Sequence, residues 1–306
     1  MGISNYEIGK EIGSESFGTI NLAEDLQDGE KVVVKCVSKN NIQRSHMGSQ
    51  VKKEITTMKK LDHPTIVRIV EVLMSHSHLY LVLEFARGGE LFTKLAKQGR
   101  MSESVARRYF QQVMNALNYC HDLYICHRDI KPEKIRLDVD DNVKIADFGF
   151  ASKMEPEPEQ EPGWGSALAP MPSIHENIQP ETIQTLDEFI SLAFKRMQKM
   201  STMCGTTHYM APEIVNRTSY RGDKADIGSC GVVLFVLLTG LFPFDSAGPN
   251  MVVQKIKNGT FVIPDFVSSV VKDVLGQLFT PNLSTRPSAR TVVRHEGFAG
   301  SDAQTV

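Results

Sequence analysis

The sequence predicts an α+β fold in which strands dominate the first part of the chain and helices the remainder. Apolar and polar side chains alternate through residues 6–37, a period of two that is typical of β-strands. Helical spacing begins in Ser49–Lys60 and returns after Ser102, which is placed to cap a long helix. The apolar run Gly231–Leu238 is too short to span a bilayer and predicts a core helix. With 306 residues, the chain can bury a large core as one bilobal domain or as two domains.

Composition narrows the class of protein and its surroundings. The formal net charge is −2, so nothing favours binding to nucleic acid or to a membrane surface. The N-terminus does not resemble a signal peptide, and Tyr6 stands where a myristoylation pattern needs Ser or Thr. An odd number of cysteines without metal-ligand spacing predicts buried free thiols in a reducing compartment, and we expect a cytoplasmic protein. These cysteines are Cys36, Cys120, Cys126, Cys204 and Cys230.

The strand-rich part contains a glycine-rich turn followed by a lysine. Tyr6–Ile12 and Gly18–Glu24 are expected strands that flank the sequence I-G-S-E-S-F-G-T-I. Glycines such as Gly13 would let backbone N–H groups approach an anion without a Cβ in the way. Lys35 ends the next apolar run, V-V-V-K. Taken alone, a lysine in that place predicts only a solvated charge.

Two acidic residues are held by a predicted hairpin in the stretch Cys126–Gly149. The apolar runs Ile135–Leu137 and Val143–Ala146 flank a turn, and this hairpin would bring Asp129 and Asp147 to the mouth of one cleft. Phosphoryl transfer needs one carboxylate to orient and accept the proton of a hydroxyl, and another to hold Mg²⁺ on the phosphates. Lys131, which follows Asp129 closely, would neutralise charge on the group in transfer.

The sequences H-R-D-I-K and D-F-G in this stretch resemble the catalytic and metal loops of eukaryotic protein kinases. The resemblance extends over residues 6 to about 298 and is closest to the calcium/calmodulin-dependent and AMP-activated kinase group. It implies a bilobal α+β fold with an N-lobe at residues 1–86, a C-lobe at 87–300 and a tail at 301–306. It also implies ATP and Mg²⁺ as cofactors and serine or threonine of proteins as the acceptor, the latter from H-R-D-I-K and G-T-T-H-Y.

The same resemblance assigns expected roles to residues of the N-lobe. Lys35 matches the lysine that positions the ATP phosphates, and Glu54 in the helix Ser49–Lys60 matches its ion-pair partner. Leu83 would be the gatekeeper, and the backbones of Glu84 and Ala86 would face the adenine edge. The residues expected around the nucleotide are Ile12, Gly13, Gly18, Ile20, Val33, Lys35, Leu83, Glu84, Ala86 and Arg136.

The region between the metal loop and the remaining helices is unusually long for this family. Its first residues, 155–162, are acidic and proline-rich, which predicts a disordered or extended segment. An amphipathic pattern follows in Glu181–Met200, so residues of about 155–200 are interpreted as an insertion in the activation segment. Asp226 is expected to begin a buried helix. Arg286 matches the arginine that pairs with Glu213 as a structural clasp.

Several positions depart from the kinase pattern, and most of them surround the expected nucleotide. Lys134 stands where the family has an asparagine that ligates a second Mg²⁺, and an ammonium has no lone pair for a metal. Arg136 replaces a leucine under the adenine, and Val33 replaces the small alanine above it. Glu15 replaces the middle glycine of the phosphate loop, and Gly228 replaces a tryptophan.

Four of these departures also have an alternative that preserves activity: Glu15 could point to solvent, and Val33 adds only two methyl groups. Arg136 could lay its stem along the pocket and send its guanidinium outward, and Lys134 could pair with Asp147 or a phosphate and supply the charge of the missing metal. The interpretation adopted is a serine/threonine kinase, of low or ordinary activity, with Asp129, Lys131, Lys35 and Glu54 as catalytic residues and Asp147 as metal ligand. The alternatives are a pseudokinase that acts as a scaffold, and a protein in which nucleotide only sets the conformation.

Substrate choice and regulation are also expected from the resemblance. Glu90 and Glu133 match positions that pair with arginines upstream of the phosphorylated residue in basophilic relatives, although exposed glutamates are more often solvated. Thr202 matches the activating phosphothreonine, with Arg128 as the partner of its phosphate, so an upstream activating kinase is expected. The helix at 181–200 either packs on the C-lobe or covers the substrate groove until Thr202 is phosphorylated.

Overall fold

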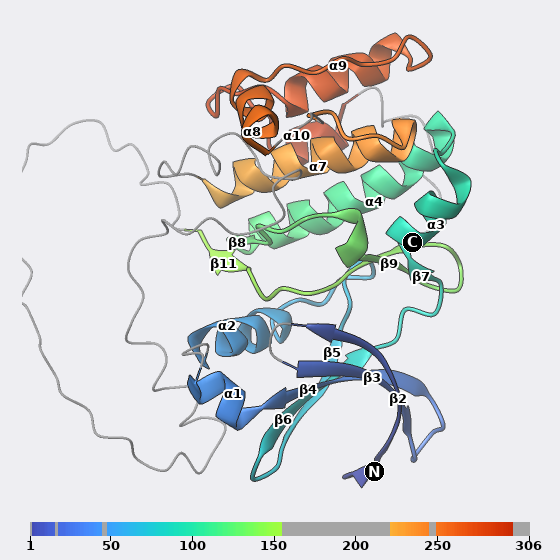
Figure 1. The fold of residues 1–306 in the computed structure, drawn as a ribbon, viewed down its shortest axis with the longest axis vertical. Coiled ribbons are helices and arrows are strands. Elements are labelled where there is room, and N and C mark those ends of the chain that lie inside the picture. Colours follow the sequence, from blue (N-terminus) through green and yellow to red (C-terminus); the bar gives the residue numbers. More distant parts are fainter. Residues whose placement is uncertain (1, 16–17, 45–47, 155–220, 245–248, 296–306) are drawn as a thin grey trace, which may run out of the picture.

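The computed structural model describes residues 2–15, 18–44, 48–154, 221–244 and 249–295. These residues form a sheet-rich part and a helical part, which lie one above the other along the long axis of the molecule (Figure 1). Strands dominate the sequence up to Glu84, and helices dominate after Leu91. The α+β bilobal class expected from the sequence is confirmed.

The sheet-rich part is built on six antiparallel strands in the order β1-β2-β3-β4-β6-β5. The period-two alternation of these segments places one set of side chains in the core and the other toward solvent. Val34, for example, is fully buried, whereas Lys31 on the same strand is exposed. The strands are β1 (Gly2–Ile3), β2 (Tyr6–Glu15), β3 (Gly18–Asp25), β4 (Lys31–Ser38), β5 (Ile69–Met74) and β6 (His78–Glu84).

Two helices pack against this sheet. The helix α1 (Lys39–Arg44) follows β4 directly, and α2 (Gly48–Met58) begins one residue before the predicted helix and ends two residues earlier. The apolar face of α2, including Val51 and Ile55, is buried against Leu79 and Leu81 of the sheet. One acidic residue of α2, Glu54, is also buried. This orientation directs Glu54 toward β4.

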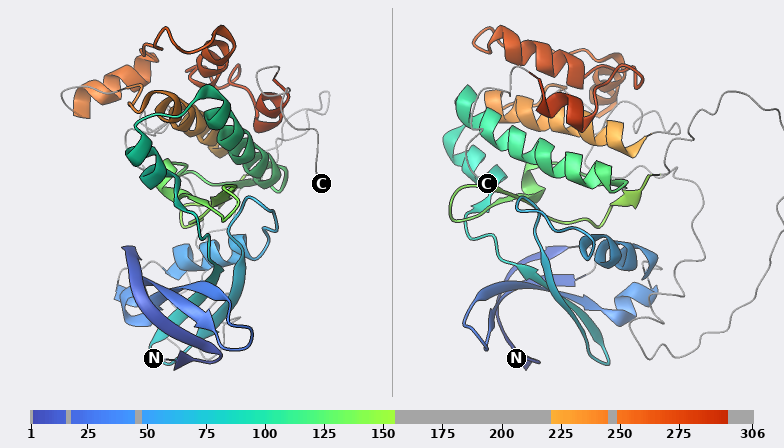
Figure 2. Two further views of the ribbon diagram at one scale, coloured as in Figure 1. Left: turned by 90° about the vertical axis from the view of Figure 1, so that its right-hand side faces the viewer. Right: turned by 180° about the vertical axis from the view of Figure 1, so that it is seen from behind.

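The helical part surrounds two long helices that lie side by side, α4 and α7 (Figures 1 and 2). Ser102 caps α4 as predicted, and its Oγ accepts a hydrogen bond from the N–H of Val105 at 3.4 Å. The run Gly231–Leu238 lies inside α7 and is buried, as expected for a core helix. The helices are α3 (Leu91–Gln98), α4 (Glu103–Asp122), α7 (Gly222–Thr239), α8 (Pro249–Asn258), α9 (Ser269–Leu278) and α10 (Ala289–Val293).

Two small sheets lie where the helical part faces the six-stranded sheet (Figure 1). One has the order β10-β9-β7, and the other pairs β11 with β8. The predicted hairpin is confirmed, since Ile135–Leu137 pairs antiparallel with Val143–Ile145. The elements are β7 (Gly89–Glu90), β8 (Ile125–Cys126), the 3₁₀ helix η1 (Pro132–Lys134), β9 (Ile135–Leu137), β10 (Val143–Ile145) and β11 (Ser152–Lys153).

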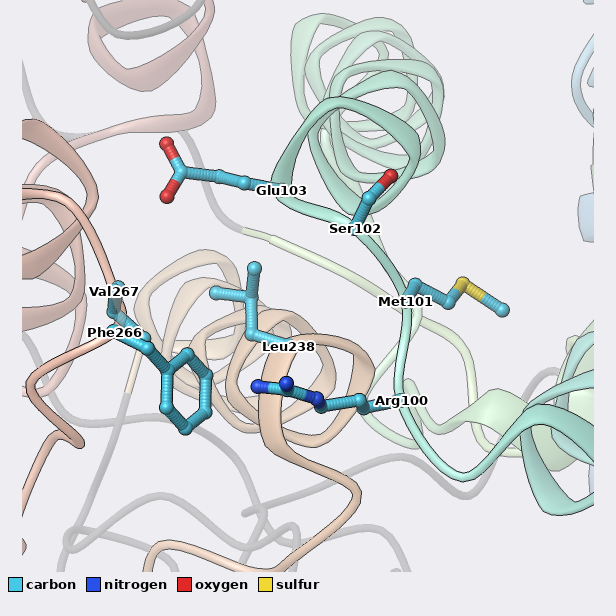
Figure 3. A pocket seen from close by; sticks show the side chains of 7 residues that line it. All are labelled: Arg100, Met101, Ser102, Glu103, Leu238, Phe266 and Val267. Atoms are coloured by element: carbon cyan, nitrogen blue, oxygen red, sulfur yellow. The ribbon is translucent and has the colours of Figure 1, made fainter.

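A pocket of about 390 Å³ opens in the helical part, at the N-terminal end of α4 (Figure 3). Arg100 lies over the ring of Phe266, with 4.4 Å between the guanidinium carbon and the ring centroid. None of the expected site residues lines this pocket, whose lining is formed by Arg100, Met101, Ser102, Glu103, Leu238, Phe266 and Val267. Among the described helices, none is long and apolar enough to cross a membrane.

A glycine in the middle of α7 explains how closely this helix approaches α9. A Cβ at Gly231 would lie 2.9 Å from Cε1 of Phe279 and 3.0 Å from Cβ of Leu278. The ring of Phe279 is held by edge contacts with Phe244 and Phe261, with ring centroids 5.2 and 4.7 Å apart, so it has little room to move. Gly276 is the contrasting case, because a Cβ at this position in α9 would meet nothing within 4 Å.

We therefore expect Gly231→Ala to lower the free energy of unfolding by about 1–3 kcal/mol, the usual cost of overpacking a core. Gly276→Ala should raise it by up to about 1 kcal/mol, because alanine is the better helix former and no contact opposes it. Urea denaturation followed by far-UV circular dichroism measures both changes. Equal effects of the two substitutions would show that helix propensity, and not the α7–α9 contact, decides the stability at Gly231.

Candidate active site

The hairpin β9–β10 brings the two expected acidic residues close together. Asp129 lies between β8 and η1, before the hairpin, and Asp147 follows β10 closely. The hairpin is closed by a hydrogen bond from Ala146 N–H to Lys134 O at 2.9 Å, so the two loops leave it side by side. Asp129 is buried and Asp147 is partly buried. One ammonium, that of Lys134, contacts both carboxylates.

The backbone of the catalytic loop is hydrogen-bonded to Asp226 of α7. This carboxylate is fully buried and accepts hydrogen bonds from the N–H of His127 at 2.9 Å and of Arg128 at 2.6 Å. Arg128 has a φ of 65°, a left-handed conformation that is costly outside glycine. Asp226 was expected only to begin the buried helix, but α7 begins earlier, at Gly222, and Asp226 lies inside it. An aspartate within an apolar helix was the sequence signal for this role.

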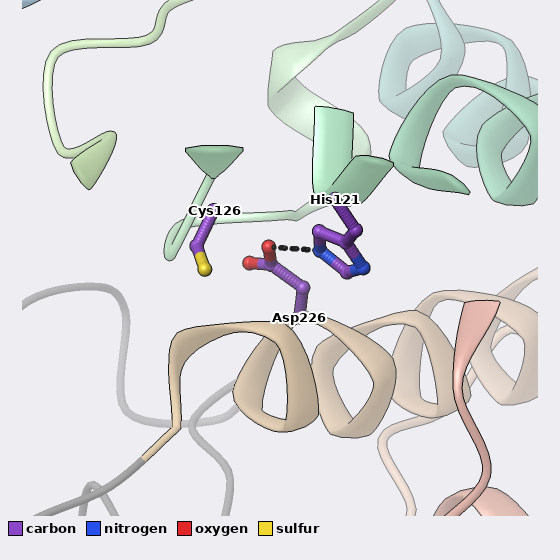
Figure 4. Close-up of side chains that lie close together, drawn as sticks. All are labelled: His121, Cys126 and Asp226. Atoms are coloured by element: carbon purple, nitrogen blue, oxygen red, sulfur yellow. Dashed lines mark hydrogen bonds and ion pairs between the residues drawn. The ribbon is translucent and has the colours of Figure 1, made fainter. Parts of the chain in front are cut away.

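His121 and Cys126 complete a small cluster around Asp226 (Figure 4). The Nε2 of His121 lies 3.0 Å from Oδ2 of Asp226, and the potential ligand atoms of the three residues lie within 4.8 Å of one another. Burial raises the pKa of the Cys126 thiol far above its ordinary value, so this sulfur stays protonated. Because Asp226 is already engaged by three donors, the cluster is a structural support and not a metal centre.

His127 and Phe148 join the catalytic loop to the metal loop behind the carboxylates. Their rings are in an edge contact with centroids 4.8 Å apart, and both side chains are almost fully buried. Nε2 of His127 lies 3.3 Å from Ala146 O. Burial and the nearby Lys134 ammonium lower the pKa of His127, which keeps the ring neutral.

Lys134 forms the central ion pairs of the site. Its Nζ lies 2.7 Å from Oδ2 of Asp147 and also contacts Oδ2 of Asp129, while Lys131 Nζ lies 3.5 Å from the latter oxygen. Burial alone would lower the pKa of Lys134, but Asp147 and Asp129 together raise it, so the side chain is an ammonium. Burial alone would raise the pKa of Asp147, but the cations Lys134 and Lys35 outweigh it and lower this pKa to about 2. This arrangement was one of the alternatives expected for Lys134.

The expected ion pair between strand and helix is formed. Lys35 Nζ lies 2.8 Å from Oε1 of Glu54, and both side chains are buried. Gln50, one turn earlier on α2, donates from its Nε2 to Gly149 O at 2.9 Å. A Cβ at Gly149 would lie 3.0 Å from Asp147 Oδ1 and 3.5 Å from Glu54 Oε2. The helix α2 is therefore attached to the metal loop directly. The role of Gln50 was not expected from the sequence.

The residues expected around the nucleotide line up on adjacent strands. Gly13 is opposite Ile20, Ile20 opposite Lys35, and Val33 opposite Leu83, as cross-strand partners. Gly18 is required by a close approach, because a Cβ there would lie 1.9 Å from Cys36 O. Ile12 is half exposed.

The segment after β6 is attached to its surroundings through Glu84. The N–H of Glu84 donates to Arg68 O at 2.9 Å, and its carboxylate lies 2.5 Å from Lys144 Nζ. Ala86 is buried, and its N–H has no hydrogen-bond partner in the described part of the chain. An N–H in this state can serve the edge of a bound base.

Arg136 is paired in a way that the sequence did not predict. It is the cross-strand partner of Glu90, and its Nη1 lies 2.9 Å from Oε1 of Glu90. The other oxygen of Glu90 accepts from Thr93 Oγ1 at 3.5 Å. The guanidinium is thus directed toward β7, as in the outward orientation considered above. No sequence motif shows this pairing, because the pairing depends on the register of two short strands.

Other expected residues lie outside the described ranges. Thr202, Glu213 and the predicted helix 181–200 are among them, as is the side chain of Glu15. Arg128, the expected partner of a phosphate on Thr202, donates from Nε to Phe150 O at 2.7 Å. Arg286 is buried and donates to the carbonyl oxygens of Thr280 and Lys224.

The carboxylate of Asp147 fits one magnesium ion with nucleotide phosphates. Carboxylate oxygens are the protein ligands that Mg²⁺ prefers, and it is commonly bound by one or two of them together with phosphates. One oxygen of Asp147 is engaged by the N–H of Gly149 at 3.1 Å, and the other by Lys134. The donor set therefore suits one ion on Asp147 better than two.

Comparison with known proteins gives one family over nearly the whole chain. A family model described as "Protein kinase domain" matches residues 6–172 and 174–298. The chain is 36% identical over 296 residues to "CBL-interacting protein kinase 32" of Oryza sativa subsp. japonica, covering 97% of this chain and 59% of that protein. It is 36% identical over 284 residues to "CBL-interacting serine/threonine-protein kinase 26" of Arabidopsis thaliana, covering 93% and 56%. The chain thus spans somewhat over half the length of these relatives.

The contacts of Asp226 lead to a prediction about stability. Asp226→Asn replaces one acceptor oxygen by an amide that faces a backbone N–H, so a buried donor loses its partner. We expect the free energy of unfolding to fall by about 1–3 kcal/mol, measured by urea denaturation. Asp140→Asn, on the exposed turn of the hairpin, is the matched control and should change it by less than about 0.5 kcal/mol. A loss no larger at Asp226 than at Asp140 would contradict the role assigned to the buried carboxylate.

Proposed function

The chain belongs to the protein kinase family, and we propose that it transfers the γ-phosphoryl group of ATP to serine or threonine side chains of proteins. The observation that carries this proposal is the joint placement of Asp129, Asp147 and the Lys35–Glu54 pair around one site. Relatives that match 93–97% of the chain are named as protein kinases, which favours transfer over a scaffolding pseudokinase.

The proposed mechanism follows from the positions of these side chains. Asp129 accepts a hydrogen bond from the substrate hydroxyl and orients it for in-line attack on the γ-phosphorus. Lys35, held by Glu54, contacts the α- and β-phosphates, and Lys131 neutralises charge on the group in transfer. Asp147 would hold Mg²⁺, which supplies charge neutralisation on the phosphates. The Ala86 N–H and the backbone of Glu84 would serve the adenine edge, between Val33 and the region of Arg136.

Protein substrates with basic residues upstream of the acceptor are part of the proposal. Glu133 supports it, because its Oε2 is buried without a hydrogen-bond partner in the described part of the chain, and a guanidinium would satisfy this oxygen. Glu90 supports it less, since Arg136 already pairs with one of its oxygens and Thr93 with the other. We expect Arg136 to act as an internal competitor for a substrate arginine. The preference for basic residues should therefore be weaker than two free glutamates would give.

Control by an upstream kinase and a cytoplasmic location complete the proposal. A phosphate on Thr202 would find a guanidinium at Arg128, beside Asp129. Four cysteines in the described part of the chain, namely Cys36, Cys120, Cys126 and Cys230, are free thiols, and three of them are buried. Free thiols suit a reducing compartment. The lobes are proposed to divide at residues 86 and 87, with residues of about 155–200 as an insertion.

The activity itself is tested with Asp129→Asn. The purified chain should incorporate phosphate from γ-labelled ATP and Mg²⁺ into a basic serine peptide. Because the amide cannot accept the hydroxyl proton, the variant should lose about 10²-fold or more of kcat. Asp140→Asn should retain the wild-type rate, and thermal unfolding should show both variants folded. Incorporation that is absent from the wild type, or unchanged in Asp129→Asn, would favour the pseudokinase.

Substrate choice is tested with Arg136→Leu. Removing the guanidinium frees Glu90, so a peptide with an upstream arginine should gain about tenfold in kcat/KM over its alanine counterpart, the value of one charge-assisted hydrogen bond. The double variant Arg136→Leu with Glu90→Gln should lose that gain. If Glu90→Gln alone already removes a strong arginine preference in the wild type, Arg136 gives way to substrate and does not compete with it.

A further inference from the structure

Lys134 is fixed in place by its main chain on both sides. Its N–H donates to Lys131 O at 3.0 Å, and its carbonyl oxygen accepts from Ala146 N–H at 2.9 Å. The residue therefore joins the catalytic loop to the strand that leads into Asp147. The side chain is only 10% exposed, and its Nζ lies 5.0 Å from the centroid of the Phe150 ring. The ammonium is held where the two loops meet.

The position of this ammonium is between two carboxylates that would otherwise repel each other. Oδ2 of Asp147 lies 2.7 Å from Nζ, and Oδ2 of Asp129 also contacts it. Two carboxylates that share a partly buried site cannot both ionise easily without a cation between them. In metalloenzymes that cation is a divalent ion, whose removal leaves the negative charge uncompensated. Here the chain provides the cation itself.

We propose that Lys134 is a resident cation that takes the place of one of the two divalent ions used in phosphoryl transfer by kinases. The chain consequently binds a single divalent ion with its nucleotide, on Asp147. This inference deepens the proposed function and rests on it for the catalytic part. The ammonium neutralises the carboxylates but has no lone pair to bind a metal. It therefore excludes a second ion from the space between them. Lys131 is not an equivalent cation, because its Nζ lies 3.5 Å from Asp129 and its side chain is twice as exposed, at 20%.

The number of bound ions tests the proposal without requiring activity. The full chain is saturated with the non-hydrolysable analogue adenylyl imidodiphosphate and titrated with Mn²⁺, and free Mn²⁺ is counted by electron paramagnetic resonance. The wild type should bind one Mn²⁺ per chain. Lys134→Asn, which offers a carbonyl oxygen, should bind two, and Lys134→Arg, which keeps the charge, should bind one. Two ions in the wild type, or one in Lys134→Asn, would overturn the proposal.

A second variant separates the charge from the missing ligand. Lys134→Met retains the approximate length of the side chain but leaves both carboxylates without the ammonium. In the absence of nucleotide, this variant should bind Mn²⁺ at least tenfold more tightly than the wild type, because the ion no longer competes with a fixed cation. Lys134→Arg should bind as weakly as the wild type. Equal affinity of the wild type and Lys134→Met would show that the ammonium does not occupy the ion's place.

Magnesium dependence then shows whether the resident cation takes part in turnover. Above the concentration that converts ATP to its magnesium complex, the wild-type rate should no longer rise with Mg²⁺. The rate of Lys134→Asn should rise in a second phase as a second ion binds, and Lys134→Met should stay at least tenfold below the wild type. A higher rate in Lys134→Met than in the wild type would overturn the role as a working cation. If all forms are inactive but the Mn²⁺ counts hold, the proposed function fails while the cation replacement stands.

Discussion

The hydrogen bonds between the buried carboxylate of Asp226 and the catalytic loop are the interaction on which the rest of the site depends. Asp226 lies within α7 and is fully buried. Its carboxylate accepts hydrogen bonds from two successive backbone N–H groups of the catalytic loop. A buried charge is costly unless donors surround it, and here the donors are the N–H groups that the left-handed turn at Arg128 exposes. Hydrogen bonds to a residue of α7 thus offset the cost of the left-handed backbone at Arg128. The strained loop in turn places Asp129 beside the ammonium groups of Lys131 and Lys134.

Charge compensation by the chain itself is the second principle of the site. Lys35 pairs with Glu54, Lys134 with Asp129 and Asp147, and Arg136 with Glu90. These pairs differ in burial and therefore in consequence. The buried pairs fix the relative positions of the sheet, α2 and the two loops, because breaking one would leave an unpaired charge in a medium of low dielectric. The more exposed pair at Glu90 contributes little to stability, and its consequence lies in the substrate choice proposed above.

The sequence was sufficient for the fold class and the hairpin, because each has a local pattern. Alternation predicts the strands, helical spacing predicts α2 and α4, and two apolar runs around a turn predict the hairpin β9–β10. What could not be predicted depends on register and on three-dimensional approach. The pairing of Arg136 with Glu90 follows from a two-residue strand match. The need for glycine at position 231 follows from the ring of Phe279, which lies beyond the end of another helix. A departure such as Lys134 was visible in the sequence, and its pairing with Asp147 was one of the alternatives, but its contact with Asp129 was not foreseen.

The hydrogen bond from Gln50 to Gly149 O joins α2, in the sheet-rich part of the molecule, to the loop that carries Asp147. Hinge closure and opening in two-lobed enzymes are rigid-body rotations about a few linking residues. In this chain that hydrogen bond connects α2 directly to the loop after β10. A rotation that carries α2 outward must either break this hydrogen bond or pull the loop with it. The position of α2 and the position of the acidic residue Asp147 are therefore linked by a direct contact.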